Sequence, residues 1–458
     1  MRMNSLVLSK IEKLCFVLIC VLMADCCLFG AGRLMAFGPV GFRLALFAVV
    51  MVVSVPILLK NWKQLLQNKF MQLLIVFFIW LIFEAVRGIQ RGNNISILAS
   101  DLRGFAYLAF LPVVLCVVNT PGRANILSKV IMYTSAVLGL FAILSLVVFL
   151  WFPDLFELLL YLTPEEGTTV GVVAYTGITS KLLRVFFYSG LYLLCGCTLS
   201  IYYQIKETGK IRLSYSFITG VCLFALLLTY TRSVYFAAFV AAVALFAVFA
   251  IKGSKDCRAR LAKHLLASVA VFAVVLMVFS VSAKTNYLGY AFSRVGVTFG
   301  NTDFSEETDA TEETNYEQTD DEDEYNTITA ESDELRARTV EEMLSNIRQS
   351  PIIGLGLGLA LKIRETGYSE YFYLDMLSKT GIVGLLLYVA PLLYMVFMLL
   401  KSRKMGKSQV DLAWALTAAL LGFFVYSYFN PYMNAALGIL LYCCTIGACQ
   451  VTTKETAK

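Results

Sequence analysis

The sequence predicts an all-α integral membrane protein with about twelve transmembrane helices. Of its 458 residues, 59% are apolar and 15% are charged, whereas soluble proteins average about 45–50% apolar and about 25% charged residues. The mean hydropathy is +0.72, and apolar runs close to the roughly 20 residues that a bilayer requires recur along the chain. These runs outweigh the two or three soluble domains that length alone would predict.

The apolar runs divide the chain into three regions. Residues 1–283 hold nine runs, at about 12–30, 39–59, 69–88, 97–118, 125–151, 183–204, 212–230, 233–251 and 264–283. Residues 380–458 hold three more and a cytoplasmic tail, at about 380–401, 409–428 and 433–450. Residues 284–379 between them are predicted to form one large extracytoplasmic loop before the tenth span.

The first run resembles a signal peptide because it follows Arg2, Lys10 and Lys13. However, no small-residue cleavage site follows it, and "LMADC" places Asp25 before Cys26, which makes a poor lipidation signal. We therefore expect an uncleaved first helix.

Basic connections set the expected orientation. Basic segments precede the first span and otherwise occur in connections that lie on the same side of the membrane: the N-terminus, "KNWKQLLQNK", "IKETGKIR", "KGSKDCRARLAKH" and "KSRKMGK". Basic loops stay in the cytoplasm. Both termini of this multi-pass cell (inner) membrane protein are then cytoplasmic, and the active site faces the extracytoplasmic side. The net charge of +6 comes from these tethers, so nucleic acid binding is not implied.

Cysteine and histidine usage restricts the chemistry. All twelve cysteines lie within predicted spans except Cys257, so structural disulfides are not expected. No zinc-site spacing is present, and no metal or cofactor is expected. The single histidine, His264, lies beside a cytoplasmic basic loop, which excludes a Ser-His-Asp or Cys-His arrangement at an outer site.

The large loop has an acidic part and a helical part. Fifteen acidic residues lie between Asp303 and Glu334, so residues about 301–334 are predicted to be disordered. Calcium binding is the sharper alternative, but the EF-hand spacing and its glycine are missing. Residues about 335–378 are predicted to form amphipathic helices, the first along the membrane surface. Its apolar face carries Val340, Met343, Leu344 and Ile347.

"SPIIGLGLG", residues 350–358, is not a nucleotide-binding loop. It lacks the Lys-Ser/Thr of a phosphate-binding loop, and no βαβ unit surrounds it. We expect a tight, flexible turn that returns the chain to the membrane and brings Arg336 and Glu370 over one outer pocket.

Ionisable residues near the spans gather at the outer leaflet, and such charges mark functional sites by default. Arg33, Arg43 and Arg87 are expected to pair or snorkel as structural residues. Arg184 and Arg232 have no acidic residue within one helical turn, and a guanidinium there suits a phosphate. Glu370, Asp375, Glu84 and Asp101 are the outer carboxylates that could serve as a general base.

Three stretches resemble one family: "LLLTYTRSVYFAAFVAAVALF", "RARTVEEMLSNIRQSPIIGLGLG" and "SEYFYLDMLSKTGIVGLLLYVAPLL". They resemble the O-antigen ligase/polymerase superfamily (WaaL-like and Wzy-like membrane glycosyltransferases), and are closest to polysaccharide repeat-unit polymerases. The "TRS" turn at Thr231–Ser233, Arg336 fifteen residues before Pro351, and the closing Gly381 and Gly384 carry the resemblance. It covers residues of about 180–400 well.

The resemblance implies roles for particular residues. Arg184, Arg232 and Arg336 would bind the diphosphate of the carrier lipid. Ligases of the family carry a His-Asn pair eleven residues before the first closing glycine, where this chain has Glu370 and Tyr371. Glu370 would then be catalytic, as the base for the attacking hydroxyl or its orienting acceptor; a helix-start Glu favoured by the dipole is the structural alternative. Further candidates are Arg103, Asp101, Arg338, Tyr371 and Asp375.

The implied activity is that of a metal-independent, GT-C-type glycosyltransferase. It would transfer a glycan from an undecaprenyl-diphosphate donor to a hydroxyl of a lipid-linked acceptor glycan, making O-antigen, capsule or exopolysaccharide. A chain-length regulator and a flippase of the same pathway are the expected partners. The alternatives are a ligase acting on another lipid or protein acceptor, a lipid-linked sugar transporter or flippase, and a scaffold protein.

Overall fold

The structure is a computed structural model. It describes residues 5–30, 36–37, 40–152, 154–156, 172–175, 183–206, 213–296, 321–363, 369–401 and 408–456. Arg33 and residues 301–320 of the acidic stretch lie outside these ranges, so their expected roles are not addressed by the structure.

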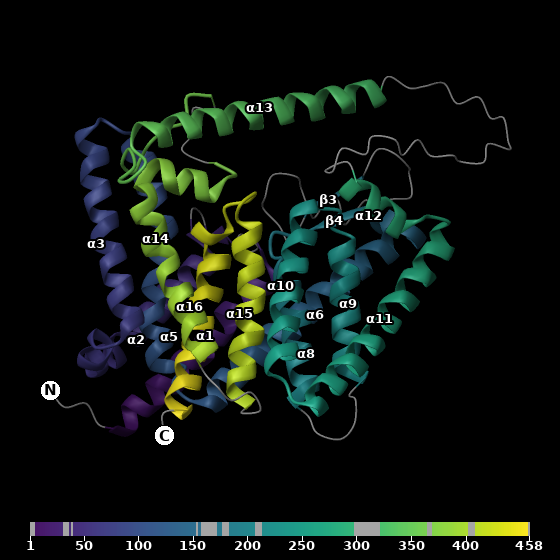
Figure 1. Cartoon of the computed structure of the whole chain (residues 1–458), viewed down its shortest axis with the longest axis horizontal. Coiled ribbons are helices and arrows are strands. Elements are labelled where there is room, and N and C mark those ends of the chain that lie inside the picture. The colour runs from purple at the N-terminus through teal and green to yellow at the C-terminus, as the bar shows by residue number, and fades with distance from the viewer. Residues whose placement is uncertain are drawn as a thin grey trace.

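Long helices run side by side through the molecule, and α13 lies across one end of them (Figure 1). The helices of the first half are α1 (Ser5–Leu28), α2 (Phe42–Leu66), α3 (Lys69–Gln90), α4 (Ile95–Ala106), η1 (Tyr107–Phe110), α5 (Leu111–Val117), α6 (Pro121–Trp151), α8 (Tyr192–Lys206) and α9 (Leu213–Leu227). Those of the second half are α10 (Arg232–Lys252), α11 (Lys255–Ala283), α12 (Tyr287–Gly296), α13 (Asp321–Gln349), α14 (Phe372–Lys401), α15 (Ser408–Tyr426), η3 (Tyr432–Asn434) and α16 (Ala436–Thr456).

The predicted apolar runs lie mostly on helices, except that the sixth, about 183–204, begins with a strand, and the chain is a predominantly α-helical membrane protein. In the described residues, seven helical segments are long and apolar enough to cross a membrane: Phe42–Leu66, Lys69–Gln90, Ile95–Val117, Pro121–Trp151, Arg232–Ile251, Lys255–Ala283 and Phe372–Lys401. Three shorter apolar helices are Leu213–Leu227, Asp411–Tyr426 and Ala436–Val451. The count of twelve spans and the GT-C type stay predictions.

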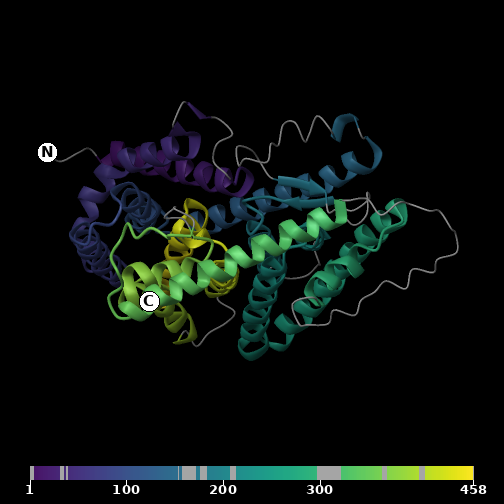
Figure 2. The same cartoon turned by 90° about the horizontal axis from the view of Figure 1, so that it is seen from above.

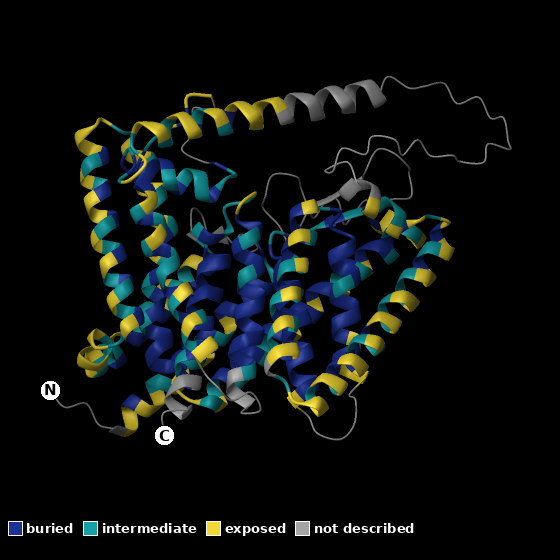
Figure 3. Cartoon of the chain, in the orientation of Figure 1, coloured by how far each residue is buried: buried dark blue, intermediate teal, exposed yellow. Residues whose placement is uncertain are grey.

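The interior is formed by the central helices, whereas peripheral helices expose apolar side chains. Buried residues concentrate in the central helices and exposed ones in α3 and α11 (Figure 3). α15 packs against α8, α10, α14 and α16, which makes it an interior helix. Large apolar side chains exposed on α11, such as Leu266 and Met277, 73% and 68% exposed, suit contact with lipid.

Several sequence-based predictions need correction. Two antiparallel hairpins, β1–β2 (Ala36–Phe37 and Val40–Gly41) and β3–β4 (Val172–Tyr175 and Leu183–Phe186), interrupt the all-α fold. Arg184 therefore lies on a strand rather than at the start of the sixth span. Arg184 pairs with Ala174 across the β3–β4 hairpin, and an apolar run alone cannot reveal such a pairing.

The large loop is also more helical than expected. α13 begins at Asp321, inside the segment predicted to be disordered, and α12 was not anticipated. Seen from above, α13 extends from the α14 side of the molecule towards the α12 side (Figure 2). The predicted second helix is confirmed: α14 begins at Phe372 and is broken at Gly381, whose φ and ψ are 67° and −175°.

Both ends of the described chain lie on the same side of the molecule. α1 begins and α16 ends on the side of the molecule opposite α13 (Figure 1). We refer to the α13 side as the outer side, following the orientation predicted from the basic connections.

Candidate functional site

Arg184 is bound to the turn that carries Arg232. Its Nε donates to the carbonyl oxygen of Thr229 over 3.1 Å, and its Nη2 donates to Thr231 Oγ1 over 3.2 Å. The amide of Val185 donates to the carbonyl of Leu228 over 3.0 Å, which ties strand β4 to the same turn. Arg184, on strand β4, is thus hydrogen-bonded to the turn that precedes Arg232.

Tyr230 gives the turn its unusual shape. Its φ of 44° lies in the left-handed region, which costs an L-residue roughly 1–2 kcal/mol. The ring of Tyr290 on α12 packs edge-on against it, with centroids 4.8 Å apart. Arg232 follows as the first residue of α10, and its side chain is exposed. The buried tyrosine therefore anchors a turn whose arginine faces outwards.

Arg336 and Glu370 meet at the outer side, as the sequence predicted. Arg336 Nε donates to Glu370 Oε2 over 3.3 Å, with side chains 45% and 33% exposed. Arg336 lies on α13, and Glu370 lies two residues before α14 begins. A partly exposed cation and a partly exposed carboxylate are thus in direct contact, and both side chains are accessible from the surface.

The glycine-rich segment, residues 350–358, forms the predicted turn and is held by side-chain hydrogen bonds, so we call it the glycine clamp. Arg87 donates to the carbonyls of Ile353 and Gly354 over 2.8 and 3.2 Å. Asn93 Nδ2 donates to the carbonyl of Leu357 over 3.0 Å. The segment is therefore fixed between α3 and α14 by hydrogen bonds from well-packed side chains.

Glycine is required where this clamp crosses α14. Gly354 and Gly381 have φ of 71° and 67°. A Cβ on Gly354 would lie 2.5 Å from the carbonyl carbon of Lys379, and one on Gly381 would lie 2.2 Å from the carbonyl oxygen of Ile352. The glycines permit two backbones to touch, and no phosphate-binding role is needed to explain them.

A buried ammonium, which sequence reasoning missed, links the clamp to two predicted carboxylates. Lys379 Nζ lies 2.9 Å from Asp101 Oδ1 and 2.9 Å from Asp375 Oδ1. The Lys379 side chain is 4% exposed, and those of Asp101 and Asp375 are 12% and 15% exposed. Asp101 Oδ2 also accepts from the amide of Gly358 over 2.9 Å. Asp101 and Asp375 are thus paired with one buried lysine.

The loop between α15 and α16, residues 427–435, contacts residues close in sequence to both arginine groups. The Tyr432 hydroxyl donates to the carbonyl of Tyr188 over 2.5 Å, shortly after β4. The ring of Tyr428 lies 6.4 Å from that of Tyr371, centroid to centroid. The loop therefore contacts Tyr188, four residues after Arg184, and Tyr371, the residue after Glu370.

The remaining candidates are less central. Arg338 binds Glu334 on its own helix over 2.5 Å, with both side chains more than 60% exposed (64% and 62%). Arg103 is exposed on α4. Its neighbour Gly104 lies against the carbonyl oxygen of Asn434, which would be 2.6 Å from an added Cβ. Arg103 thus borders the same loop, whereas Arg338 belongs to the surface of α13.

Two arginines have the structural roles expected of them. Arg43 forms a buried pair with Asp25 at 2.7 Å, and Arg87 forms one with the fully buried Glu84 at 2.7 Å. Because Glu84 is fully buried and paired, it is not a candidate general base at the surface.

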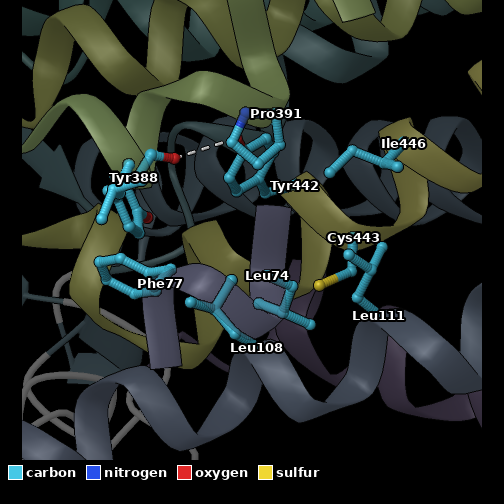
Figure 4. A pocket seen from close by; sticks show the side chains of 10 residues that line it. Leu74, Phe77, Leu108, Leu111, Tyr388, Pro391, Tyr442, Cys443 and Ile446 are labelled. Atoms are coloured by element: carbon cyan, nitrogen blue, oxygen red, sulfur yellow. Dashed lines mark hydrogen bonds between the residues drawn. The ribbon is translucent and has the colours of Figure 1, made fainter. Parts of the chain in front are cut away.

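A small apolar cavity lies deeper between the helices (Figure 4). Side chains of α3, η1, α5, α14 and α16 line it, among them Leu74, Phe77 and Ile446. No charged side chain lines it, so it does not suit a diphosphate. Within the described part of the chain, no cluster of three His, Cys, Asp or Glu residues has the grouping of a metal site.

Comparison with known proteins adds one match. Residues 217–389 match the family model described as O-Antigen ligase. This range includes the turn with Arg232, the pair of Arg336 with Glu370, the glycine clamp and Lys379. No curated protein matches the chain.

Proposed function

Through residues 217–389 this chain belongs to the O-antigen ligase/polymerase superfamily, and we propose that it is a polysaccharide repeat-unit polymerase. Its donor and acceptor are glycans carried on undecaprenyl diphosphate, and the reaction takes place at the outer face of the membrane. The contact between Arg336 and Glu370 carries this proposal. It brings together a cation for the leaving group and a base for the nucleophile.

The arginines serve the leaving group. When the glycosidic bond to the carrier breaks, negative charge grows on the terminal phosphate oxygen of the lipid diphosphate. Fixed cations that face this oxygen stabilise the transition state more than the ground state. Arg232 and Arg336 are exposed and hold the diphosphate with parallel hydrogen bonds. Arg184 sets the turn of Arg232 through its bonds to Thr229 and Thr231.

Glu370 serves the nucleophile. A hydroxyl oxygen of the acceptor sugar attacks the anomeric carbon of the donor, forming the new C–O bond as the bond to the diphosphate breaks. The proton of that hydroxyl passes to the Glu370 carboxylate, and the lipid diphosphate leaves. A positioned general base of this kind contributes about 10²–10⁴-fold to the rate.

Ligation is a second candidate, because the matched family is described as O-Antigen ligase. The chemistry at the donor is the same in both reactions, and only the acceptor differs. Glu370 and Tyr371, at the position where ligases of the family carry His-Asn, favour the polymerase.

The test supplies the purified protein with undecaprenyl-diphosphate-linked repeat units in vesicles. A ladder of longer glycans supports the polymerase. Transfer of a glycan only to a non-repeat acceptor supports the ligase. Movement of intact donor across the vesicle membrane without any new glycosidic bond contradicts both enzyme proposals and supports a transporter.

A further inference from the structure

Three aromatic side chains form a series of ring contacts that starts at the residue after Glu370, and we call them the aromatic shelf: Tyr371, Tyr428 and Phe429. The Tyr371 and Tyr428 rings are 6.4 Å apart at 77°, and the Tyr428 and Phe429 rings are 4.9 Å apart at 78°. Tyr428 is 48% exposed and Phe429 is 43% exposed. Tyr371 is half-buried and directly follows Glu370 in the chain.

The shelf is held in place from both sides. The Tyr373 hydroxyl donates to the carbonyl of Phe424 over 2.6 Å, joining the start of α14 to the end of α15. The amides of Tyr428 and Phe429 donate to the carbonyls of Val425 and Tyr426 over 3.2 and 3.0 Å. These bonds hold the backbone on both sides of the shelf.

Aromatic rings at a membrane–water boundary often serve as interfacial anchors. The position of the shelf argues against that role. α15, which ends directly before it, is an interior helix in contact with α8, α10, α14 and α16. Lipid-facing anchors are expected on peripheral helices instead. One member of the shelf, Tyr371, directly follows Glu370, which pairs with Arg336.

The chemistry of such rings suits a sugar. A pyranose ring has one face of C–H groups that packs on an aromatic ring, and hydroxyls at its edge that a tyrosine hydroxyl can bind. Tyrosine offers an apolar body and a polar tip with little conformational entropy to lose. A sugar seated here is next to the carboxylate that is to remove its proton.

We propose that Tyr371, Tyr428 and Phe429 form the subsite for the acceptor sugar, which presents its attacking hydroxyl to Glu370. This inference rests on the proposed function, because it takes Glu370 to be the base. The subsite selects the acceptor glycan, whereas the arginines hold the lipid diphosphate of the donor.

The experiment uses the lipid-linked donor together with a lipid-free acceptor. This acceptor is the same repeat-unit oligosaccharide attached to a soluble aglycone in place of the lipid. Tyr428→Ala and Phe429→Ala should each raise the acceptor KM about fivefold or more, leaving the donor KM unchanged. Tyr428→Phe should lie between Tyr428→Ala and wild type, because it keeps the ring. Phe292→Ala, which removes a ring 67% exposed on α12, is the matched control and should leave both constants unchanged.

Unchanged acceptor KM in both alanine variants, with an active wild type, overturns the subsite. A raised donor KM instead identifies the rings as lipid anchors and also overturns it. Saturation-transfer NMR measures binding of the same oligosaccharide to the purified protein without any reaction. This measurement tests the subsite separately from the proposed polymerase activity. Binding that is lost in Tyr428→Ala supports the subsite even if no elongation occurs, and no binding to wild type contradicts it.

Discussion

At the scale of single residues, Glu370 and Arg336 bind each other, although the proposed role of each is to bind a different part of the substrates. Glu370 Oε2 accepts a hydrogen bond from Arg336 Nε over 3.3 Å. The proposed base and the arginine proposed to bind the diphosphate therefore neutralise each other before substrate binds. A bound diphosphate competes with Glu370 for Arg336. Donor binding and the release of the base are therefore coupled.

Glu370→Gln should bind undecaprenyl diphosphate more tightly than wild type although it cannot elongate. The exposed ion pair is worth about 0.2–1 kcal/mol, so affinity should rise by up to about fivefold. Lipid binding to purified protein in detergent measures this. Glu341→Gln removes an equal charge from an exposed position of α13 and should change nothing. An affinity in Glu370→Gln equal to or below that of wild type contradicts the competition.

Lys379 is the residue whose loss should destabilise the site most. Lys379→Met leaves Asp101 and Asp375 facing each other in a mostly buried place. Removing one partner of a buried ion pair costs about 3–5 kcal/mol. The thermal unfolding midpoint should fall clearly, and Lys379→Met with Asp101→Asn should recover part of the loss. A single variant that melts like wild type contradicts a structural role for Lys379.

At the scale of elements, hydropathy and spacing predicted much of this protein, because both are local properties of the chain. The apolar runs lie mostly on helices, and the positions of Arg336 and Glu370 on either side of the glycines anticipated their contact. The role of Lys379 was missed because an Asp and a Lys one helical turn apart, as Asp375 and Lys379 are, normally indicate an ion pair on the helix surface. Its other partner, Asp101, lies 278 residues away. The β4 strand was missed because its apolar residues continue into the next helix.

Gly381→Ala should disrupt the crossing of the glycine clamp and α14. The added Cβ would meet the carbonyl oxygen of Ile352 at 2.2 Å, at a φ of 67°. We expect a large loss of folded protein, measured by fluorescence-detected size-exclusion chromatography. Gly92→Ala, with a φ of 78° but nothing within 4 Å, tests the backbone strain alone and should cost about 1–2 kcal/mol.

Gly122→Ala completes this set, since it has nothing within 4 Å and lies in the first turn of α6. It should be neutral or slightly stabilising. Equal yields of Gly381→Ala and Gly122→Ala would show that the crossing tolerates a side chain, contrary to the geometry.

At the scale of the whole molecule, the proposed site and the ends of the chain lie on opposite sides. α13 covers the side of the two arginine groups, and α1 begins and α16 ends on the other (Figure 1). Cys257 lies near the start of α11 and is partly exposed. These positions allow the orientation of the protein to be measured.

A membrane-impermeant maleimide should label Glu341→Cys in intact cells, because Glu341 is exposed on α13. Cys257 should react only after the membrane is permeabilised, and Cys257→Ser in both samples identifies its signal. Labelling of Cys257 in intact cells, with protection of position 341, would reverse the orientation and place the proposed site in the cytoplasm.

The most direct measurement is elongation of undecaprenyl-diphosphate-linked repeat units by Arg232→Ala and Glu370→Gln, beside wild type. Each variant should melt like wild type, because both side chains are partly or fully exposed. Each should elongate at least about 100-fold more slowly, since one loses a cation facing the leaving group and the other loses the base. Full elongation by both variants would contradict the proposed site.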